Sequence, residues 1–186
     1  MKRCLLLSGL IFCVGTVRLS QSAELQHDLV VYGGTSAGIA AAVQASRMGH
    51  SVIVVEPGRH LGGLTSGGLG WTDSGRKDAI GGVSREFYQR LKRHYDDPKS
   101  WKFGDRGEYG RYRSQDDAMW TFEPHVAEKV FRTMLKEAGV RVVTGERLNR
   151  STGVVRQNQT IVAITSESGN IYRGLMFIDA GYEGDL

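Results

Sequence analysis

The sequence predicts an α/β fold built around a parallel sheet, and three observations support this class. An apolar segment, LVVYGG, follows Asp28 and ends in glycines, as a buried strand does before a tight turn. The alanine-rich stretch over 36–50 predicts a helix closed by Gly49. A second β-branched segment over 51–57 is stopped by Pro57. Strand, helix and strand together take about 30 residues, the length of a crossover between parallel strands.

The first 23 residues have the layout of a secretory signal peptide. Lys2 and Arg3 precede an apolar run, and small polar residues follow it as far as Ala23. The run from Cys4 to Val17 has 14 residues, fewer than the roughly 20 that cross a bilayer. We therefore expect cleavage near Ala23, export to the periplasm or the outside, and no stable membrane anchor.

Removal of this segment changes the charge and the cysteine content of the chain. The net charge of +4 falls to +1, because 21 basic and 20 acidic residues remain. Such a balance argues against nucleic acid as a partner. Both cysteines, Cys4 and Cys13, are also lost, so the mature chain has no thiol for a disulfide, a zinc site or an iron-sulfur cluster.

The middle of the chain predicts a long loop, two helices and a strand. Nine glycines between 58 and 82 exclude regular structure there, and such loops within domains are usually functional. Val83, Phe87 and Leu91 recur every four residues and predict a helix over about 84–95. Residues 99–122 have no clear period and predict no element. A second helix starts at Pro124, and VRVVTG over 140–145 predicts a strand.

The last forty residues predict strands. Residues 147–173 alternate in short segments that are broken at 151–153 and 168–170, which indicates an antiparallel meander. LMFIDAG, residues 175–181, then predicts a further buried strand.

The turn after the first strand resembles two kinds of phosphate-binding loop. Gly33 and Gly38 have the spacing of a P-loop, but Ile39 and Ala40 stand where that loop needs lysine and a hydroxyl residue. The dinucleotide fingerprint needs glycines at relative positions 1, 3 and 6, which are here Gly33, Thr35 and Gly38. Two of three are met, so we favour a dinucleotide site.

The exception in this fingerprint makes a structural prediction. Thr35 stands where the backbone must approach a pyrophosphate, so its side chain must either point aside or offer its hydroxyl to the phosphate. Gly34 can absorb some of the strain. Glu56 ends the second strand 18 residues beyond Gly38, where an acid accepts hydrogen bonds from ribose hydroxyls.

The motifs together resemble the FAD-dependent oxidoreductase family that includes proteins similar to heterodisulfide reductase and their secreted relatives. The segments that carry this resemblance are DLVVYGGTSAGIAAA, VIVVEP, HLGGLTSGGLGWTD, FEPHVAEKVFRTMLKEAGVRVV and FIDAGYEGDL. They cover nearly all of residues 27–186.

The resemblance implies a cofactor, FAD, and the residues that bind it. The implied cofactor-binding residues are Gly33, Gly34, Thr35, Ser36, Ala37 and Gly38 at the pyrophosphate, Glu56 at the adenosine ribose, and Arg59, Gly62 and Gly63 along the cofactor toward the flavin. Asp179, Ala180 and Gly181 are expected near the adenosine half.

The resemblance also implies a Rossmann-like FAD-binding domain over 27–186, with a parallel sheet and an antiparallel β-meander crossover. Members of the family continue beyond the segment that matches, so we expect the chain to be an N-terminal portion, truncated before the substrate domain. The expected activity is flavin-mediated hydride or electron transfer on a small-molecule substrate that the sequence leaves open. The alternatives are a nucleotide-binding or structural module without redox activity, linked to extracytoplasmic carbohydrate processing, and an unstable truncation product.

Several side chains near these motifs have two interpretations. His60 could carry a covalent flavin bond, although a solvent-facing loop histidine is the commoner case. Trp71, Thr72 and Asp73 could line the flavin face, or Trp71 could belong to the core. His94, Asp96 and Asp97 form a polar helix end, where we expect solvation and no metal. No spacing identifies a catalytic residue.

Overall fold

A computed structural model describes residues 24–73 and 75–186 of the chain. The predicted signal peptide lies outside the described residues. A six-stranded sheet has the strand order β3-β2-β1-β6-β5-β4. The strands are β1 (Glu24–Tyr32), β2 (Val52–Glu56), β3 (Arg141–Thr144), β4 (Val154–Gln157), β5 (Thr160–Thr165) and β6 (Ile171–Asp179).

The sheet is mostly parallel, which confirms the predicted fold class. β1 pairs in parallel with both β2 and β6, and β2 pairs in parallel with β3. β4, β5 and β6 pair antiparallel, and together they form the predicted meander. The fold is thus a mixed α/β domain of the Rossmann-like type that binds dinucleotides at the carboxyl ends of its parallel strands.

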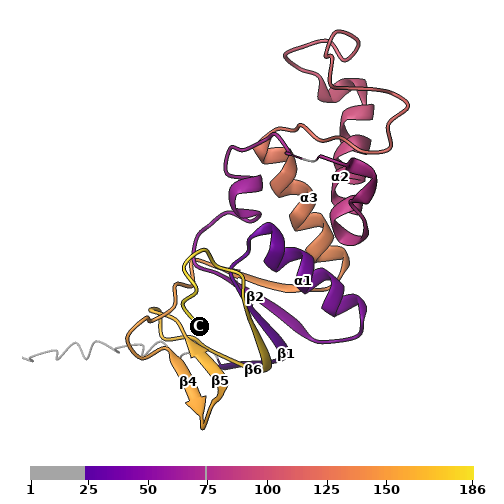
Figure 1. Cartoon of the computed structure of the whole chain (residues 1–186). Coiled ribbons are helices and arrows are strands. Elements are labelled where there is room, and N and C mark those ends of the chain that lie inside the picture. Colours follow the sequence, from indigo (N-terminus) through magenta and orange to yellow (C-terminus); the bar gives the residue numbers. More distant parts are fainter. Residues whose placement is uncertain (1–23, 74) are drawn as a thin grey trace, which may run out of the picture.

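Three α-helices lie on one side of β1 and β2, while β4 and β5 project on the opposite side (Figure 1). The helices are α1 (Ser36–Arg47), α2 (Gly82–Asp96) and α3 (Pro124–Glu137). α1 contacts β1 and β2, α3 contacts β3, and α2 packs on α1 and α3 farther from the sheet. Short 3-10 turns, η1 (Gly63–Thr65), η2 (Lys77–Ala79) and η3 (Pro98–Ser100), occupy the long connections.

Alternation along the strands divides the core into two clusters. Val31 and Val54 face the helices and pack with Ile39 of α1 and Met134 of α3. Their neighbours in the strands, such as Val30, point to the opposite face, because successive side chains in a strand alternate.

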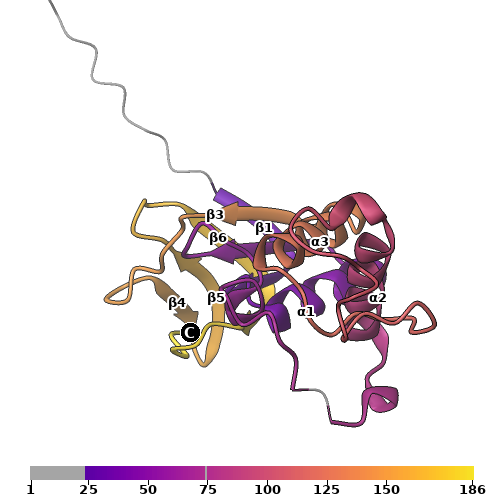
Figure 2. The same ribbon diagram turned by 90° about the horizontal axis from the view of Figure 1, so that it is seen from above.

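The opposite face is covered by the meander, which Figure 2 shows beside the parallel strands. Tyr172 and Ile164 are fully buried there against Ile53. The hydroxyl of Tyr32 accepts a hydrogen bond from the amide of Leu148 at 3.0 Å. The meander is therefore tied to the first strand of the crossover.

One predicted boundary was wrong. The last strand of the meander and the segment predicted over 175–181 form a single strand, β6, which pairs with β5 on one side and β1 on the other. Gly174 looks like a break in the sequence, but its backbone stays in the ladder opposite His27. An added Cβ at Gly174 would lie 2.9 Å from Val30, so glycine permits close packing there and does not end the strand.

Four charged side chains join the three helices. Both guanidinium nitrogens of Arg47 in α1 donate to the Glu86 carboxylate in α2, at 2.6 and 2.9 Å. Arg90 bridges Glu86 to Glu137 of α3. The hydrogen bond from Arg47 is the main cause that lowers the pKa of Glu86 to about 2, and the hydrogen bond from Arg90 adds to it against partial burial.

Replacement of Glu86 by Gln is expected to destabilise the fold by about 1 kcal/mol at neutral pH, the upper range for partly exposed ion pairs. Because the folded-state pKa lies below the ordinary value of 4.5, the contribution of Glu86 is present above that value and is lost as pH falls toward 2. Thermal unfolding between pH 7 and pH 3.5 should show a Tm difference from wild type that shrinks below about pH 4.5.

The matched control is Asp78→Asn, which removes the exposed Arg76–Asp78 ion pair and should leave the Tm nearly unchanged. A Tm difference for Glu86→Gln that is independent of pH would contradict the role of the network.

Candidate functional site

The turn between β1 and α1 requires glycine at its first and last positions. The amide of Gly33 donates to the Val55 carbonyl at 2.8 Å, and its φ is 100°. An added Cβ at Gly33 would lie 2.7 Å from the backbone carbonyl carbon of Ala180, and one at Gly38 would collide with the Gly33 carbonyl oxygen. The two glycines therefore let strand, turn and helix approach more closely than any side chain permits.

Thr35 points aside, the first of the two predicted alternatives. Its hydroxyl donates to the Ala180 carbonyl at 2.9 Å and accepts from the Gly38 amide at 3.2 Å. The residue is the N-cap of α1, with an extended backbone. Ala180 in turn donates its amide to the Tyr32 carbonyl at 2.8 Å. Threonine in place of the middle glycine thus caps the helix and ties the end of β6 to the turn.

Glu56 holds the turn from the other side. One carboxylate oxygen accepts from the Gly34 amide and the other from the Gly58 amide, each at 2.6 Å. A carboxylate oxygen can accept more than one hydrogen bond. Both oxygens can therefore still accept from ribose hydroxyls.

A cavity of about 250 Å³ opens at the carboxyl ends of β1, β2 and β6. Its lining includes Gly33, Thr35, Glu56, Gly63, Asp179 and Tyr182. This is the edge at which parallel α/β sheets bind their ligands. Ser36 and Ala37, the first two residues of α1, are exposed and line an adjoining cavity of about 230 Å³ together with Thr65.

The glycine pair after β2 is part of the same cradle. The amide of Gly62 donates to the Gly34 carbonyl at 2.7 Å, and both Gly62 and Gly63 have positive φ. A Cβ at Gly62 would lie 2.8 Å from the ring of Phe131. The hydroxyl of Tyr182 accepts from the Leu64 amide at 2.8 Å. Sequence reasoning missed Tyr182, since nothing local relates residues that far apart.

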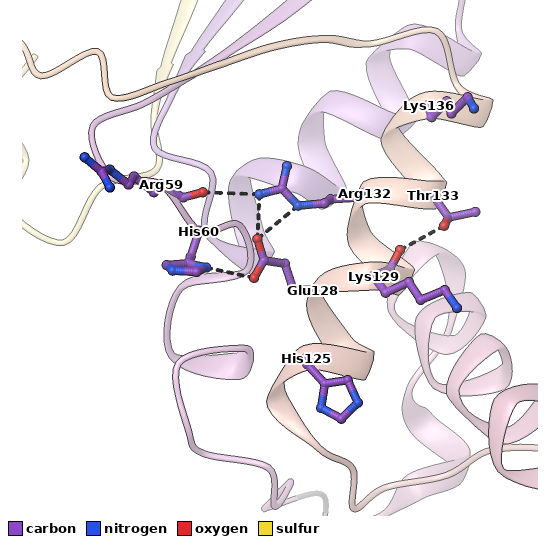
Figure 3. A pocket seen from close by; sticks show the side chains of 8 residues that line it. All are labelled: Arg59, His60, His125, Glu128, Lys129, Arg132, Thr133 and Lys136. Carbon is purple, nitrogen blue, oxygen red and sulfur yellow. Dashed lines mark hydrogen bonds and ion pairs between the residues drawn. The ribbon is translucent and has the colours of Figure 1, made fainter. Parts of the chain in front are cut away.

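Glu128 positions the loop between Glu56 and this glycine pair. Its carboxylate lies between His60 and Arg132 (Figure 3), at 2.9 Å from His60 Nδ1 and 2.6 Å from Arg132 Nη2. It also accepts from the Leu61 amide at 3.3 Å. Burial raises the pKa of the Glu128 carboxyl, but the hydrogen bonds from His60, Arg132 and Leu61 outweigh burial and hold that pKa below its usual range. Spacing alone gave no signal for this contact.

Two predicted residues lie elsewhere than expected or have a simpler role. The side chain of Arg59 points away from α3 (Figure 3) and lines the surface hollow of about 440 Å³ beside α3, not the cavity at Glu56. His60 is 84% exposed at its side chain, as a solvent-facing loop histidine is.

The remaining candidates separate in the structure. Trp71 is 55% exposed and so does not belong to the core. Asp96 accepts from Lys92 and Tyr112, and Asp97 caps η3. Over residues 24–73 and 75–186, no cluster of three His, Cys, Asp or Glu side chains could hold a metal ion.

These features fit an extended dinucleotide. Glycines at Gly33, Gly34 and Gly38 leave room where a Cβ would collide, and the first amides of α1 lack carbonyl partners within the helix, as at other phosphate-binding helix ends. Fold and site thus define a dinucleotide-binding domain.

Comparison with known proteins identifies the family. Residues 28–186 match the model of the FAD dependent oxidoreductase family, so the chain belongs to that family and its cofactor is FAD. A curated relative, 4-oxocyclohex-2-ene-1-carboxylate 5-dehydrogenase of Sinomonas cyclohexanicum, is 37% identical over 70 residues, which are 37% of this chain and 12% of the relative.

Solved structures share the fold. L-amino acid deaminase from Proteus vulgaris matches with a TM-score of 0.55 at 18% identity, over 89% of this chain and 55% of that one. Bacillithiol disulfide reductase from Staphylococcus aureus matches with a TM-score of 0.50 at 16% identity, over 84% of this chain and 38% of that one. The chain therefore spans about half, or less, of the proteins that it resembles.

Replacement of Gly38 by Ala is expected to lower the amount of retained FAD at least about tenfold, because the new methyl group must push the turn away from the Gly33 carbonyl oxygen. Flavin absorbance after gel filtration, normalised to protein, measures the effect. Gly104→Ala is the control, since no atom lies within 4 Å of an added Cβ there. Equal flavin content in the two variants would contradict the close-approach argument.

Replacement of Glu128 by Gln is expected to speed tryptic cleavage after Arg59 at least about threefold, because the loop loses an ion pair and its ordered state becomes less populated. Limited proteolysis followed by mass spectrometry measures the rate at that bond. Glu167→Gln, at an exposed carboxylate, should leave the rate unchanged. An unchanged rate in Glu128→Gln would show that Glu128 does not hold the loop.

Proposed function

We propose that the chain forms the FAD-binding part of an exported oxidoreductase that transfers a hydride or electrons between flavin and a small-molecule substrate. The observation that carries this proposal is the turn from Gly33 to Gly38, closed on one side by the Glu56 carboxylate and on the other by Ala180. A bound flavin supplies the redox chemistry, while the protein binds and orients it.

The roles of the residues follow from their positions. The Glu56 carboxylate accepts hydrogen bonds from the adenosine ribose while it keeps the amides of Gly34 and Gly58. The amides of the turn and of the first residues of α1 bind the pyrophosphate, as helix N-termini do. The segment that starts at Gly62 leads toward the flavin. Asp179 to Gly181 lie against the turn and border the adenosine half.

Several further features belong to this proposal. Within the family, the motifs favour the members similar to heterodisulfide reductase and their exported relatives. The name of the curated relative describes a dehydrogenase that acts on a ring carboxylate, which supports dehydrogenation as the reaction class. Among the described residues, no helix is long and apolar enough to cross a membrane. The substrate-binding remainder would come from sequence beyond the matched segment.

Replacement of Glu56 by Ala tests the proposal. The variant should bind FAD at least about tenfold more weakly, because it loses the ribose acceptor and frees the amides of Gly34 and Gly58. Glu56→Gln should also weaken binding, since its amide group places a donor against one of those two amides. Titration of the chain without residues 1–23 with FAD, followed by flavin fluorescence, gives the dissociation constants.

Glu167→Gln is the matched control and should bind FAD as the wild type does. FAD affinity that stays unchanged in both Glu56 variants would overturn the assigned site. FAD that is retained by the wild type but cannot be photoreduced would instead favour a nucleotide-binding module without redox activity.

A further inference from the structure

A second cavity, of about 640 Å³, lies beyond the glycine-rich segment. It is bordered by Trp71 and Thr72, by Lys77 of η2, and by the segments 109–116 and 120–121. None of these residues takes part in the cradle around Glu56. Three of them are aromatic and three are basic, with Asp116 as the acidic member.

Hydrogen bonds hold the walls of this cavity in place. The Thr72 amide donates to the Trp120 carbonyl at 3.1 Å, and the Phe122 amide donates to the Gly70 carbonyl at 2.9 Å. The Tyr109 hydroxyl donates to Thr121 Oγ1 at 3.1 Å. The cavity is therefore built from segments that are joined to one another.

Three cations border the cavity without a counter-ion of their own. In the described part of the chain, the side chains of Lys77, Arg111 and Arg113 make no hydrogen bond or ion pair. The single carboxylate in the lining, Asp116, leaves an excess of positive charge. An anionic group that entered the cavity would therefore find unused donors.

Aromatic rings provide an apolar wall beside these cations. Trp71 is 55% exposed and Tyr109 38% exposed, which is unusual for rings of this size unless they bind something. The Arg111 guanidinium lies over the Trp71 ring, 3.3 Å from its centroid. A guanidinium that stacks on a ring keeps its in-plane N–H groups for a carboxylate.

The segment between the two cavities is continuous in sequence. It starts at Gly62, which is bonded to the phosphate turn at Gly34, and ends at Trp71, which is bridged to Thr121. One short stretch of chain thus runs from the cofactor cradle to the aromatic and basic cavity.

We propose that this cavity binds the substrate through its carboxylate, and that the substrate class is a small carboxylic acid with a ring. The carboxylate pairs with Arg111, Arg113 and Lys77, and the ring packs against Trp71 and Tyr109. As a statement about substrate the proposal rests on the proposed oxidoreductase function, whereas anion binding to the cavity is independent of FAD.

Isothermal titration calorimetry of the chain, before and after loading with FAD, tests the proposal with four probes. Cyclohexanecarboxylate or glucuronate should bind with a dissociation constant below about 1 mM, and the comparison of the two distinguishes an apolar ring from a sugar acid. Cyclohexanecarboxamide lacks the charge, and inorganic phosphate lacks the ring. Each should bind at least about tenfold more weakly than the better acid.

Two variants assign the binding to the cavity. Arg111→Gln should weaken binding of the better acid at least about tenfold, and Trp71→Ala should weaken it through loss of the ring contact. Arg156→Gln, at an exposed position in β4, is the matched control and should bind as the wild type does. Circular dichroism confirms that each variant is folded.

Absence of saturable binding by either acid, equal binding of the amide, or full affinity in Arg111→Gln would each overturn the proposal. A chain that binds the acid but not FAD would sink the proposed function and leave the anion site standing. A chain that binds FAD but neither acid would do the reverse.

Discussion

The Glu56 carboxylate is the contact on which the cofactor cradle depends. Its two oxygens accept the amides of Gly34 and Gly58, so one side chain at the end of β2 fixes both the phosphate turn and the start of the following loop. The turn can lie this close only because Gly33 and Gly38 have no side chain. Thr35 completes the arrangement from the other side through its hydrogen bond to Ala180. The carboxyl ends of three neighbouring strands are thereby held in one geometry before any ligand binds, which lowers the conformational cost of binding.

The rest of the fold supports this edge of the sheet. α1 and α3 cover the strands on one face, and the meander covers the other with Tyr172 and Ile164. Charged residues link α2 to the other helices through Glu86, while Glu128 connects α3 to the loop after β2. These contacts place a glycine-rich and otherwise pliable segment at a defined position. Rigid elements therefore position the loops that contact the cofactor.

Two chemically different regions lie along one stretch of chain. The cradle near Gly62 consists of backbone groups and a carboxylate, and this suits a ligand with phosphates and ribose hydroxyls. The region near Trp71 consists of rings and unpaired cations, and this suits an organic anion. An oxidoreductase needs both kinds of surface in a fixed relation, since the flavin must meet its substrate. The hydrogen bonds of the segments 70–72 and 120–122 supply that relation.

The sequence by itself determined the crossover, the phosphate turn and the acidic residue at the end of β2. These features are local, because the strand and helix periods and the spacing from Gly33 to Glu56 can be read within about 30 residues. Tertiary structure decided the orientation of Thr35, which depends on Ala180, 145 positions away in the chain. It also decided that β6 continues through Gly174, that Glu128 holds the loop at His60, and that Arg59 lies outside the cavity. Residues 99–122 had no period to read, since their conformation follows from contacts with the segment 70–72 and with α2, and only the folded chain brings these together.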